Sequence, residues 1–252
     1  MDLTLLLDPT FLGQNLIDGL SRGAVYSVFA LGLTLIFGIL DIVNLAHAAT
    51  YMWCALTGWL VLSVAGWPLP VALFVSMGAG AALAVTLELV AFRPVRREGA
   101  DRLAPMISSI GASLILVSLA EAFFGSSTRR FPDHVLDAKP LLVGGTGGLR
   151  VTWAQILIVV VSLALMVALG LFIRNSRWGK AIRAVAANQK AAKLLGIDVN
   201  AVVIVAFAAA GALAGAAGIL VGLMTNNISP LMGSQIELRG LAVVILGGMG
   251  NF

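Results

Sequence analysis

The feature that most constrains this chain is a series of long apolar runs separated by short polar segments. Two of these runs, 153–173 and 201–224, flank the only long basic tract, which extends from Arg174 to Ile197. Each run is close to the roughly 20 apolar residues with which a helix crosses a bilayer. Because Lys and Arg resist translocation, a basic loop between two such runs is expected in the cytoplasm.

Composition indicates the same class of protein. Hydrophobic residues make up 60% of the chain and charged residues 11%, whereas a soluble domain carries about 25% charged residues. This balance predicts an all-α integral membrane protein, a polytopic helical bundle. The net charge of +4 does not indicate nucleic-acid binding, because the basic residues lie in short loops where membrane lipid is the nearer partner.

The apolar runs predict six spans and one shorter apolar piece. The spans are 14–40, 45–66, 69–92, 106–125, 153–173 and 201–224, and the shorter piece is 236–250. Ten of the sixteen basic residues lie in the loops 93–105 and 174–200, and four lie in 126–152. We therefore expect the first two loops in the cytoplasm, with the third loop and the N-terminus outside.

The last apolar piece is too short to cross a bilayer, because Leu241–Leu246 spans only six residues. A discontinuous helix or a longer native chain would explain it. We expect residues 1–252 to form one transmembrane domain that contains interrupted helices and continues beyond Phe252.

The basic tract predicts an amphipathic helical surface. At about 100° per residue, its cations share one arc and its apolar residues share the other. The cations are Lys180, Arg183, Lys190 and Lys193, and the apolar residues are Ala181, Ile182, Val185, Ala192 and Leu195. Such a surface suits binding to lipid or to another protein.

Small residues recur at helical spacing in the 201–224 run. They are Gly211, Gly215, Gly218 and Gly222. Small residues on one helix face let two backbones approach closely in a membrane, so the spacing predicts a packing seam. A smooth pore-lining face is the alternative.

Polar residues inside apolar runs are costly in lipid and mark candidate pathways. One set, spaced three residues apart, comprises Asp41, Asn44, His47 and Thr50. A second set follows the 201–224 run and comprises Asn226, Ser229 and Pro230. Both sets are compatible with capped surface turns or with broken helices that line a translocation path. Glu88, near the end of a run, is expected to pair with a neighbouring arginine or to reach the interface.

Little in the sequence indicates an enzyme. It has two histidines and one cysteine, with no HExxH or P-loop pattern. We therefore predict no catalytic site, no metal site and no cofactor in this chain.

The basic tract also carries a resemblance to a known family. Lys190-Ala191-Ala192, followed after three residues by Gly196, resembles the Glu-Ala-Ala-x-x-x-Gly loop through which bacterial ABC importer permeases bind their ATPase. With Gly179, Arg183 and Asn188 it resembles the branched-chain amino acid permeases of the LivH/LivM family. Segments 23–26, 30–34, 42–47, 229–230 and 244–250 resemble the LivH form, and the similarity extends from about residue 11 to the end. Lys190 replaces the usual Glu, and Ala48 replaces a usual Gly.

The resemblance implies a permease subunit of an ATP-driven importer of branched-chain amino acids in the bacterial inner membrane. It implies a second, LivM-like permease, two ATP-binding subunits and a periplasmic substrate-binding protein as partners, with ATP bound by the partners alone. The implied ATPase-docking residues, within the 174–200 loop, are Gly179, Arg183, Asn188, Lys190, Ala191, Ala192 and Gly196. The expected path residues are Asn44, His47, Thr50, Asn226, Ser229 and Pro230.

Three alternatives stay open. A urea or amide permease of the same family would share most of these motifs. An ion-coupled secondary transporter would use broken helices and midplane polar residues without an ATPase. A membrane scaffold would use the basic tract only to bind anionic lipid.

Overall fold

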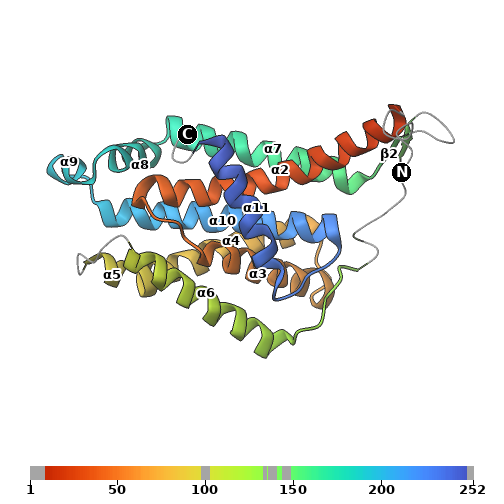
Figure 1. The fold of residues 1–252 in the computed structure, drawn as a ribbon, viewed down its shortest axis with the longest axis horizontal. Coiled ribbons are helices and arrows are strands. Elements are labelled where there is room, and N and C mark those ends of the chain that lie inside the picture. The colour runs from red at the N-terminus through yellow and green to blue at the C-terminus, as the bar shows by residue number, and fades with distance from the viewer. Residues whose placement is uncertain (1–8, 98–102, 133–134, 136–140, 144–148, 249–252) are drawn as a thin grey trace.

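The computed structural model describes residues 9–97, 103–132, 135, 141–143 and 149–248. Most of its helices run along the longest axis of the bundle, and α11 crosses them obliquely (Figure 1). The helices are α2 (Pro9–Leu40), α3 (Ala46–Trp59), η1 (Leu60–Val64), α4 (Leu69–Leu87), η2 (Glu88–Phe92), α5 (Arg93–Arg97), α6 (Leu103–Phe124), α7 (Trp153–Asn175), α8 (Arg177–Ala187), α9 (Gln189–Leu194), α10 (Val199–Thr225) and α11 (Met232–Gly247). The strands β1 (Leu141–Val143) and β2 (Leu149–Val151) pair antiparallel.

Long apolar helices confirm the predicted fold class. Five are long and apolar enough to cross a membrane, namely Thr10–Leu40, Leu69–Arg97, Leu103–Phe124, Trp153–Asn175 and Val199–Thr225. The predicted span 45–66 corresponds to α3 and the π-helical turn η1. Eleven of the fourteen residues of α3 are buried, so this segment lies inside the bundle and its surface faces protein.

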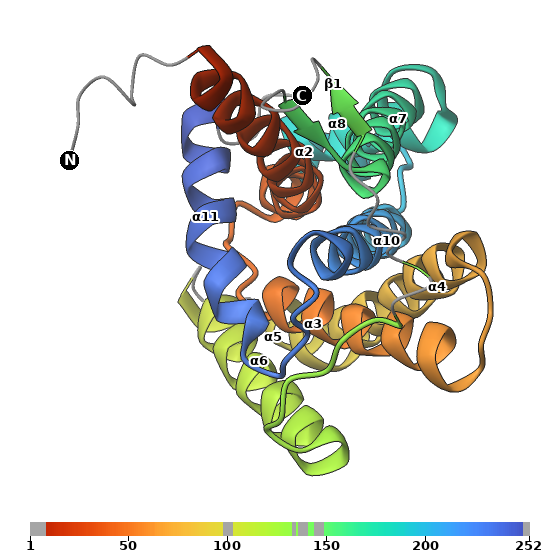
Figure 2. The same ribbon diagram turned by 90° about the vertical axis from the view of Figure 1, so that its right-hand side faces the viewer.

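Helix α10 is the centre of the bundle. Eighteen of its 27 residues are buried, whereas α7 buries four of 23 and α6 four of 22. Viewed along the bundle, α10 lies between α2, α3 and α4, with α6, α7 and α11 further out (Figure 2). The outer helices expose large apolar side chains such as Leu114, Ile115 and Leu163, which suits contact with lipid.

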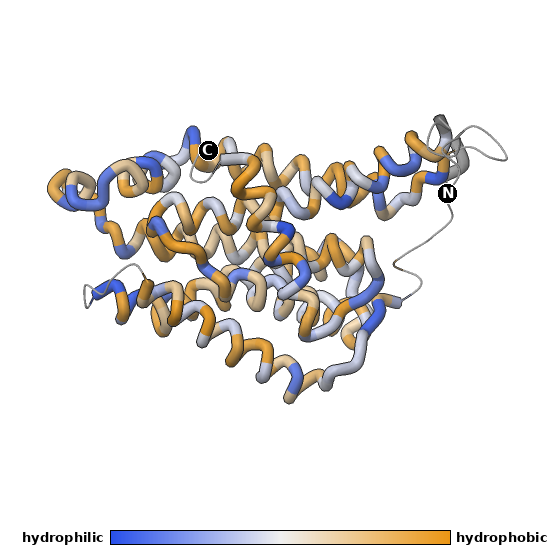
Figure 3. Tube along the Cα trace, in the orientation of Figure 1, coloured by the Kyte–Doolittle hydropathy of each residue, from blue (hydrophilic) through white to orange (hydrophobic). Residues whose placement is uncertain are grey.

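The two basic segments lie at the same end of the bundle. Helices α5, α8 and α9 gather there, and we call this the basic end (Figure 1). At the opposite end, the backbone N–H of Arg150 donates to the Gln14 side chain, and Arg129 pairs with Ile228 in an isolated β-bridge. Hydrophilic residues cluster at both ends, and apolar residues predominate between them (Figure 3). The relative placement of the loops predicted from the charge count is therefore confirmed for the described residues.

Helix α4 loses its α-helical pattern before it reaches α5. Pro94 has no backbone N–H and so cannot donate to the carbonyl four residues earlier, and the preceding turn η2 is π-helical. The widened turn brings Glu88 near Arg96, the beginning of a polar cluster at the basic end.

Candidate functional site

The 174–200 loop folds into two short helices. Asn188 separates them, because its backbone is extended and its side-chain oxygen accepts from the backbone N–H of Ala191 at 3.0 Å. Asparagine is a preferred residue for capping a helix start in this way. The predicted amphipathic surface is therefore divided between two helices. Ile182, Val185 and Ala192 are buried as expected.

Gly179 and Arg183 attach α8 to the end of α7. A Cβ at position 179 would overlap the carbonyl oxygens of Phe172 and Ile173, so only glycine permits this approach. The Arg183 guanidinium donates to the carbonyl oxygen of Ile173. Both residues were predicted to contact an ATPase, and in this chain their contacts are with α7.

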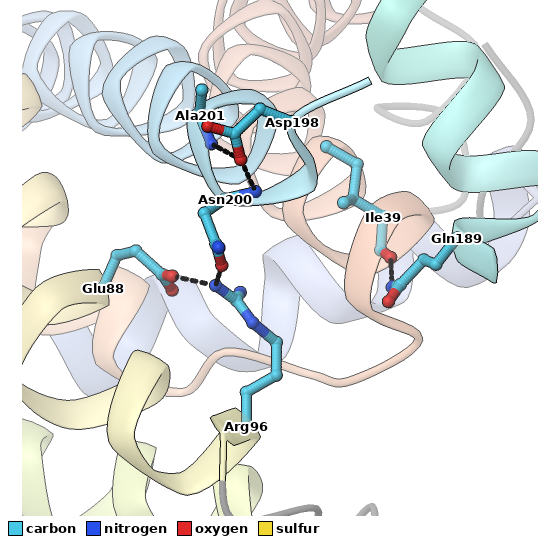
Figure 4. Close-up of polar contacts among 7 residues, drawn as sticks. All are labelled: Ile39, Glu88, Arg96, Gln189, Asp198, Asn200 and Ala201. Carbon is cyan, nitrogen blue, oxygen red and sulfur yellow. Dashed lines mark hydrogen bonds and ion pairs between the residues drawn. The ribbon is translucent and has the colours of Figure 1, made fainter. Parts of the chain in front are cut away.

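Gln189 connects α9 to α2. Its side-chain amide donates to the carbonyl oxygen of Ile39 at 2.7 Å (Figure 4). Ile39 lies in the last turn of α2, where carbonyl groups lack intrahelical donors. The bond crosses 150 positions of sequence, and it places the 174–200 loop in direct contact with the helix that ends at Leu40.

The end of α9 is an exposed apolar tip. Leu194 is 89% exposed and Leu195 80% exposed, although Leu195 was predicted on the apolar arc with the buried Ala192. Gly196 turns the chain with φ of +81°, and the N–H of Ile197 reaches the carbonyl of Ala192 at 3.0 Å. This left-handed turn ends the helix and leaves both leucines outside. Lys190, Ala191 and Lys193 are also exposed.

A second polar cluster joins η2, α5 and α10 at the basic end (Figure 4). Arg96 donates to Glu88 at 2.6 Å and to the side-chain oxygen of Asn200 at 3.2 Å. The Glu88 side chain is fully buried, so this pair satisfies a charge that would otherwise be costly. Asp198 caps α10 by accepting from the N–H groups of Asn200 and Ala201. The expected pairing of Glu88 with an arginine is confirmed.

The first predicted polar set borders an interruption between α2 and α3. Asp41 has φ of +60° and ends α2. The side-chain oxygen of Asn44 accepts from the N–H of Ala46 at 3.0 Å, and Leu45 donates to Ser109 at 3.3 Å. These local partners satisfy backbone groups that the break leaves free.

The side chains of this set are buried between helices. Asn44, His47 and Thr50 are 3%, 1% and 1% exposed. The His47 ring lies 4.9 Å from that of Phe29, beside Gly32 of α2. Thr50 donates to the carbonyl of Ala46. Their role along a translocation path stays a prediction.

The second predicted set lies at the opposite end, where α10 stops. Asn226 adopts φ of +46°, and its side-chain oxygen accepts from the N–H of Phe131 at 2.8 Å. Ser229 lines a cavity of about 400 Å³, and Pro230 is buried. Tyr51, one turn beyond His47, lines the same cavity. Asn44, His47 and Thr50 are outside this lining, so the cavity does not bring the two predicted sets together.

The four glycines of α10 lie where the helix approaches its neighbours most closely. A Cβ at Gly211 or Gly215 would overlap the backbone of α4 at Gly80 or Ser76. A Cβ at Gly218 would lie 2.7 Å from the carbonyl oxygen of Tyr51, and one at Gly222 would lie 2.6 Å from the ring of Phe131. The backbones of α10 and α4 therefore pack directly against each other in a glycine seam.

Several residues of these sites were missed from sequence. Gln189 and Arg239 donate hydrogen bonds to residues far away in the sequence, Ile39 and Tyr26. A single sequence carries no signal of that proximity.

Comparisons with known proteins extend over nearly the whole chain. The family described as branched-chain amino acid transport system / permease component matches residues 15–252. The high-affinity branched-chain amino acid transport system permease BraD of Pseudomonas aeruginosa is 32% identical, with 94% of this chain and 80% of BraD covered. LivH of Escherichia coli strain K12, of the same description, is 32% identical with 94% and 79% covered.

A more distant relative matches only part of the chain. The xylose transport system permease XylH of Haemophilus influenzae is 36% identical over 90 residues, which cover 35% of this chain and 24% of XylH. No solved structure gives a significant match. With its five candidate spans and its match over residues 15–252, this multi-pass membrane protein belongs to the family of permease components of branched-chain amino acid transport systems.

Proposed function

We propose that this chain carries branched-chain amino acids through an ATP-driven importer and that its 174–200 loop binds the ATPase. The observation that carries the proposal is the attachment of this loop. It projects at the basic end, yet it is bonded to α7 through Arg183 and to α2 through Gln189. A partner that displaced the loop would displace both helices.

The mechanism follows from these attachments. When the ATPases close on ATP, they push on α9 at its exposed tip, and α8 transmits the push to α7 through the close approach at Gly179. Gln189 transmits it to the last turn of α2. The interruption between Leu40 and Ala46 then acts as the hinge at which α2 changes its angle to α3, since chain breaks absorb such rotations. Alternation of this angle opens the bundle to one side and then to the other.

The partners complete the transporter. A LivM-like second permease pairs with this chain, two ATP-binding subunits hydrolyse ATP, and a periplasmic protein delivers the substrate. ATP is bound by the ATPases, so this chain holds no cofactor. The substrate class is supported by relatives that match 94% of the chain, whereas the xylose permease matches 35%. These matches over nearly the whole of this chain also favour branched-chain amino acids over urea or amides.

The test is leucine uptake into proteoliposomes that contain this chain, the second permease and both ATPases, with loaded binding protein outside and ATP inside. We expect uptake that requires ATP and is insensitive to collapse of ion gradients. Uptake of urea without uptake of leucine would show that the chain is a urea permease of the same family. Uptake driven by a proton or sodium gradient without ATP would assign the chain to secondary transporters. Binding to anionic vesicles without any uptake would favour a scaffold.

A further inference from the structure

Arg239 of α11 carries a positive charge that no carboxylate of the described chain neutralises. Its guanidinium carbon lies 5.6 Å from the centre of the Tyr26 ring, and its Nη1 donates to the Tyr26 hydroxyl at 2.5 Å. Among the described residues, the ion pair within 4.0 Å is Arg96–Glu88, at the basic end. Stacking on an aromatic face positions a guanidinium and leaves its charge available.

This charge lies near the middle of the bundle's length. Helices α2 and α7 run in the same direction (Figure 1), and Gln155 donates to Asp18 at 2.7 Å, which sets their register. Tyr26 follows Asp18 by about two helical turns. Two turns after Gln155, α7 has reached its middle, so Tyr26 lies level with the middle of α7. Hydrophilic residues of α11 accordingly lie in the central part of the view, far from both hydrophilic ends (Figure 3).

An arginine at this depth needs a polar environment. Ionisable residues within membrane spans face the protein interior or a water-filled cavity, because exposure to lipid is costly. The cavity of about 400 Å³ provides such an environment, and its wall includes Tyr26, Tyr51, Thr225, Ser229, Gln235 and Arg239. Ser126 and Thr128, which precede the β-bridge at the opposite end, also line it. The cavity therefore reaches from that end to the guanidinium.

The wall suits a small zwitterion with an apolar side chain. Hydroxyls and two amides lie beside apolar Val221 and Met232, and the described wall has no carboxylate. The volume is within the roughly 300–1,000 Å³ of small-molecule sites, and guanidinium groups match carboxylates in geometry and charge. We propose that Arg239, held by Tyr26, binds the α-carboxylate of the amino acid that enters from the opposite end. This inference rests on the proposed function.

The test replaces Arg239 with cysteine in a Cys54→Ala parent and measures leucine uptake by the complete transporter in proteoliposomes. We expect Arg239→Cys to lower uptake by about tenfold or more, as for loss of a charge-assisted hydrogen bond. A positively charged aminoethyl methanethiosulfonate should restore part of the uptake. The negatively charged sulfonatoethyl reagent and the neutral methyl reagent should not. Leu238→Cys, exposed on the same helix and outside the cavity wall, is the matched control and should transport like the parent.

Two results would overturn the inference alone. One is parent-like uptake by Arg239→Cys, and the other is an equal response to all three reagents, while the parent still transports leucine. A parent that transports no leucine would overturn the proposed function as well. If Arg239→Cys does not assemble with its partners, leucine uptake is measured for Arg239→Lys and Arg239→Gln in its place. Lysine should retain uptake that glutamine loses, and equal uptake by the two would contradict the inference.

Discussion

The glycine seam between α10 and α4 and the 174–200 loop are held in opposite ways. In the seam, the backbones at Gly211 and Gly80 approach so closely that neither position has room for a Cβ. In the loop, beyond the close approach at Gly179, a few hydrogen bonds attach two short helices to α7 and α2, and apolar residues at the tip remain exposed. Packed backbones resist rearrangement, whereas single hydrogen bonds permit movement at small cost.

This difference separates a fixed part of the molecule from a movable one. Changes in the seam should alter the amount of folded protein and leave the transport rate of each surviving molecule unchanged. Changes in α9 of the 174–200 loop should alter transport and leave the amount of folded protein unchanged. Uptake normalised to folded permease in the membrane distinguishes the two outcomes.

The largest effect is expected in the seam. Gly80→Ala places a methyl group against the carbonyl of Gly211 and should destabilise the fold by about 3 kcal/mol, the upper range for overpacking. Gly78→Ala is the matched control on the same helix, because a Cβ there meets nothing within 4 Å. Folded protein is measured by detergent-solubilised thermal unfolding. Equal stability of the two variants would contradict the seam as the fixed part.

The next effect is expected at the apolar tip of α9. The double variant Leu194→Ser and Leu195→Ser should weaken ATPase binding by about tenfold or more, as for loss of a buried interface anchor, and should unfold like the wild type. Lys180→Ser, also exposed on this loop, is the control and should bind normally. If Lys180→Ser weakens the loop's attachment to anionic vesicles and the leucine variant retains its ATPase, the loop is a lipid-binding surface.

A smaller effect is expected where the loop contacts α2. Gln189→Leu removes the donor to the Ile39 carbonyl and should lower leucine uptake per ATP hydrolysed by about fivefold, at the low end of coupling between sites. ATPase binding should be unchanged, because the exposed tip is intact. Lys180→Leu changes an exposed residue of the same loop outside the predicted docking set and should keep the wild-type ratio. An unchanged ratio in Gln189→Leu would show that α7 alone transmits the motion.

The smallest effect is expected at the interruption between α2 and α3. Asn44→Leu removes the side-chain oxygen that accepts from Ala46, whereas Asn44→Asp retains an acceptor there. We expect Asn44→Leu to lower uptake per folded molecule by about threefold, the equivalent of one neutral hydrogen bond, with little change in apparent affinity. A loss of folded protein with a normal rate per molecule would place Asn44 in the fixed part instead.

The sequence predicted the spans well because their signals are local. The expected starts at residues 69 and 153 coincide with α4 and α7. Thr152 and Gln155 form a reciprocal capping box at the second of these starts. The break at Asn188 was missed because helical periodicity alone does not show where a side chain will cap the backbone. The candidate sites were harder, since the contacts of Gln189 with Ile39 and of Arg239 with Tyr26 join positions 150 and 213 residues apart.

The most direct test of whether the 174–200 loop binds the ATPase is a crosslink from the tip of α9. Leu194→Cys in the Cys54→Ala parent would carry a cysteine-linked photoreactive group in membranes that contain the whole transporter. We expect it to crosslink to the ATP-binding subunit. The control Leu114→Cys, exposed on the outer surface of α6, should not crosslink to that subunit. Crosslinking of position 194 to lipid alone, in membranes where the ATPase co-purifies with this chain, would contradict the assignment of the 174–200 loop as the ATPase-binding surface.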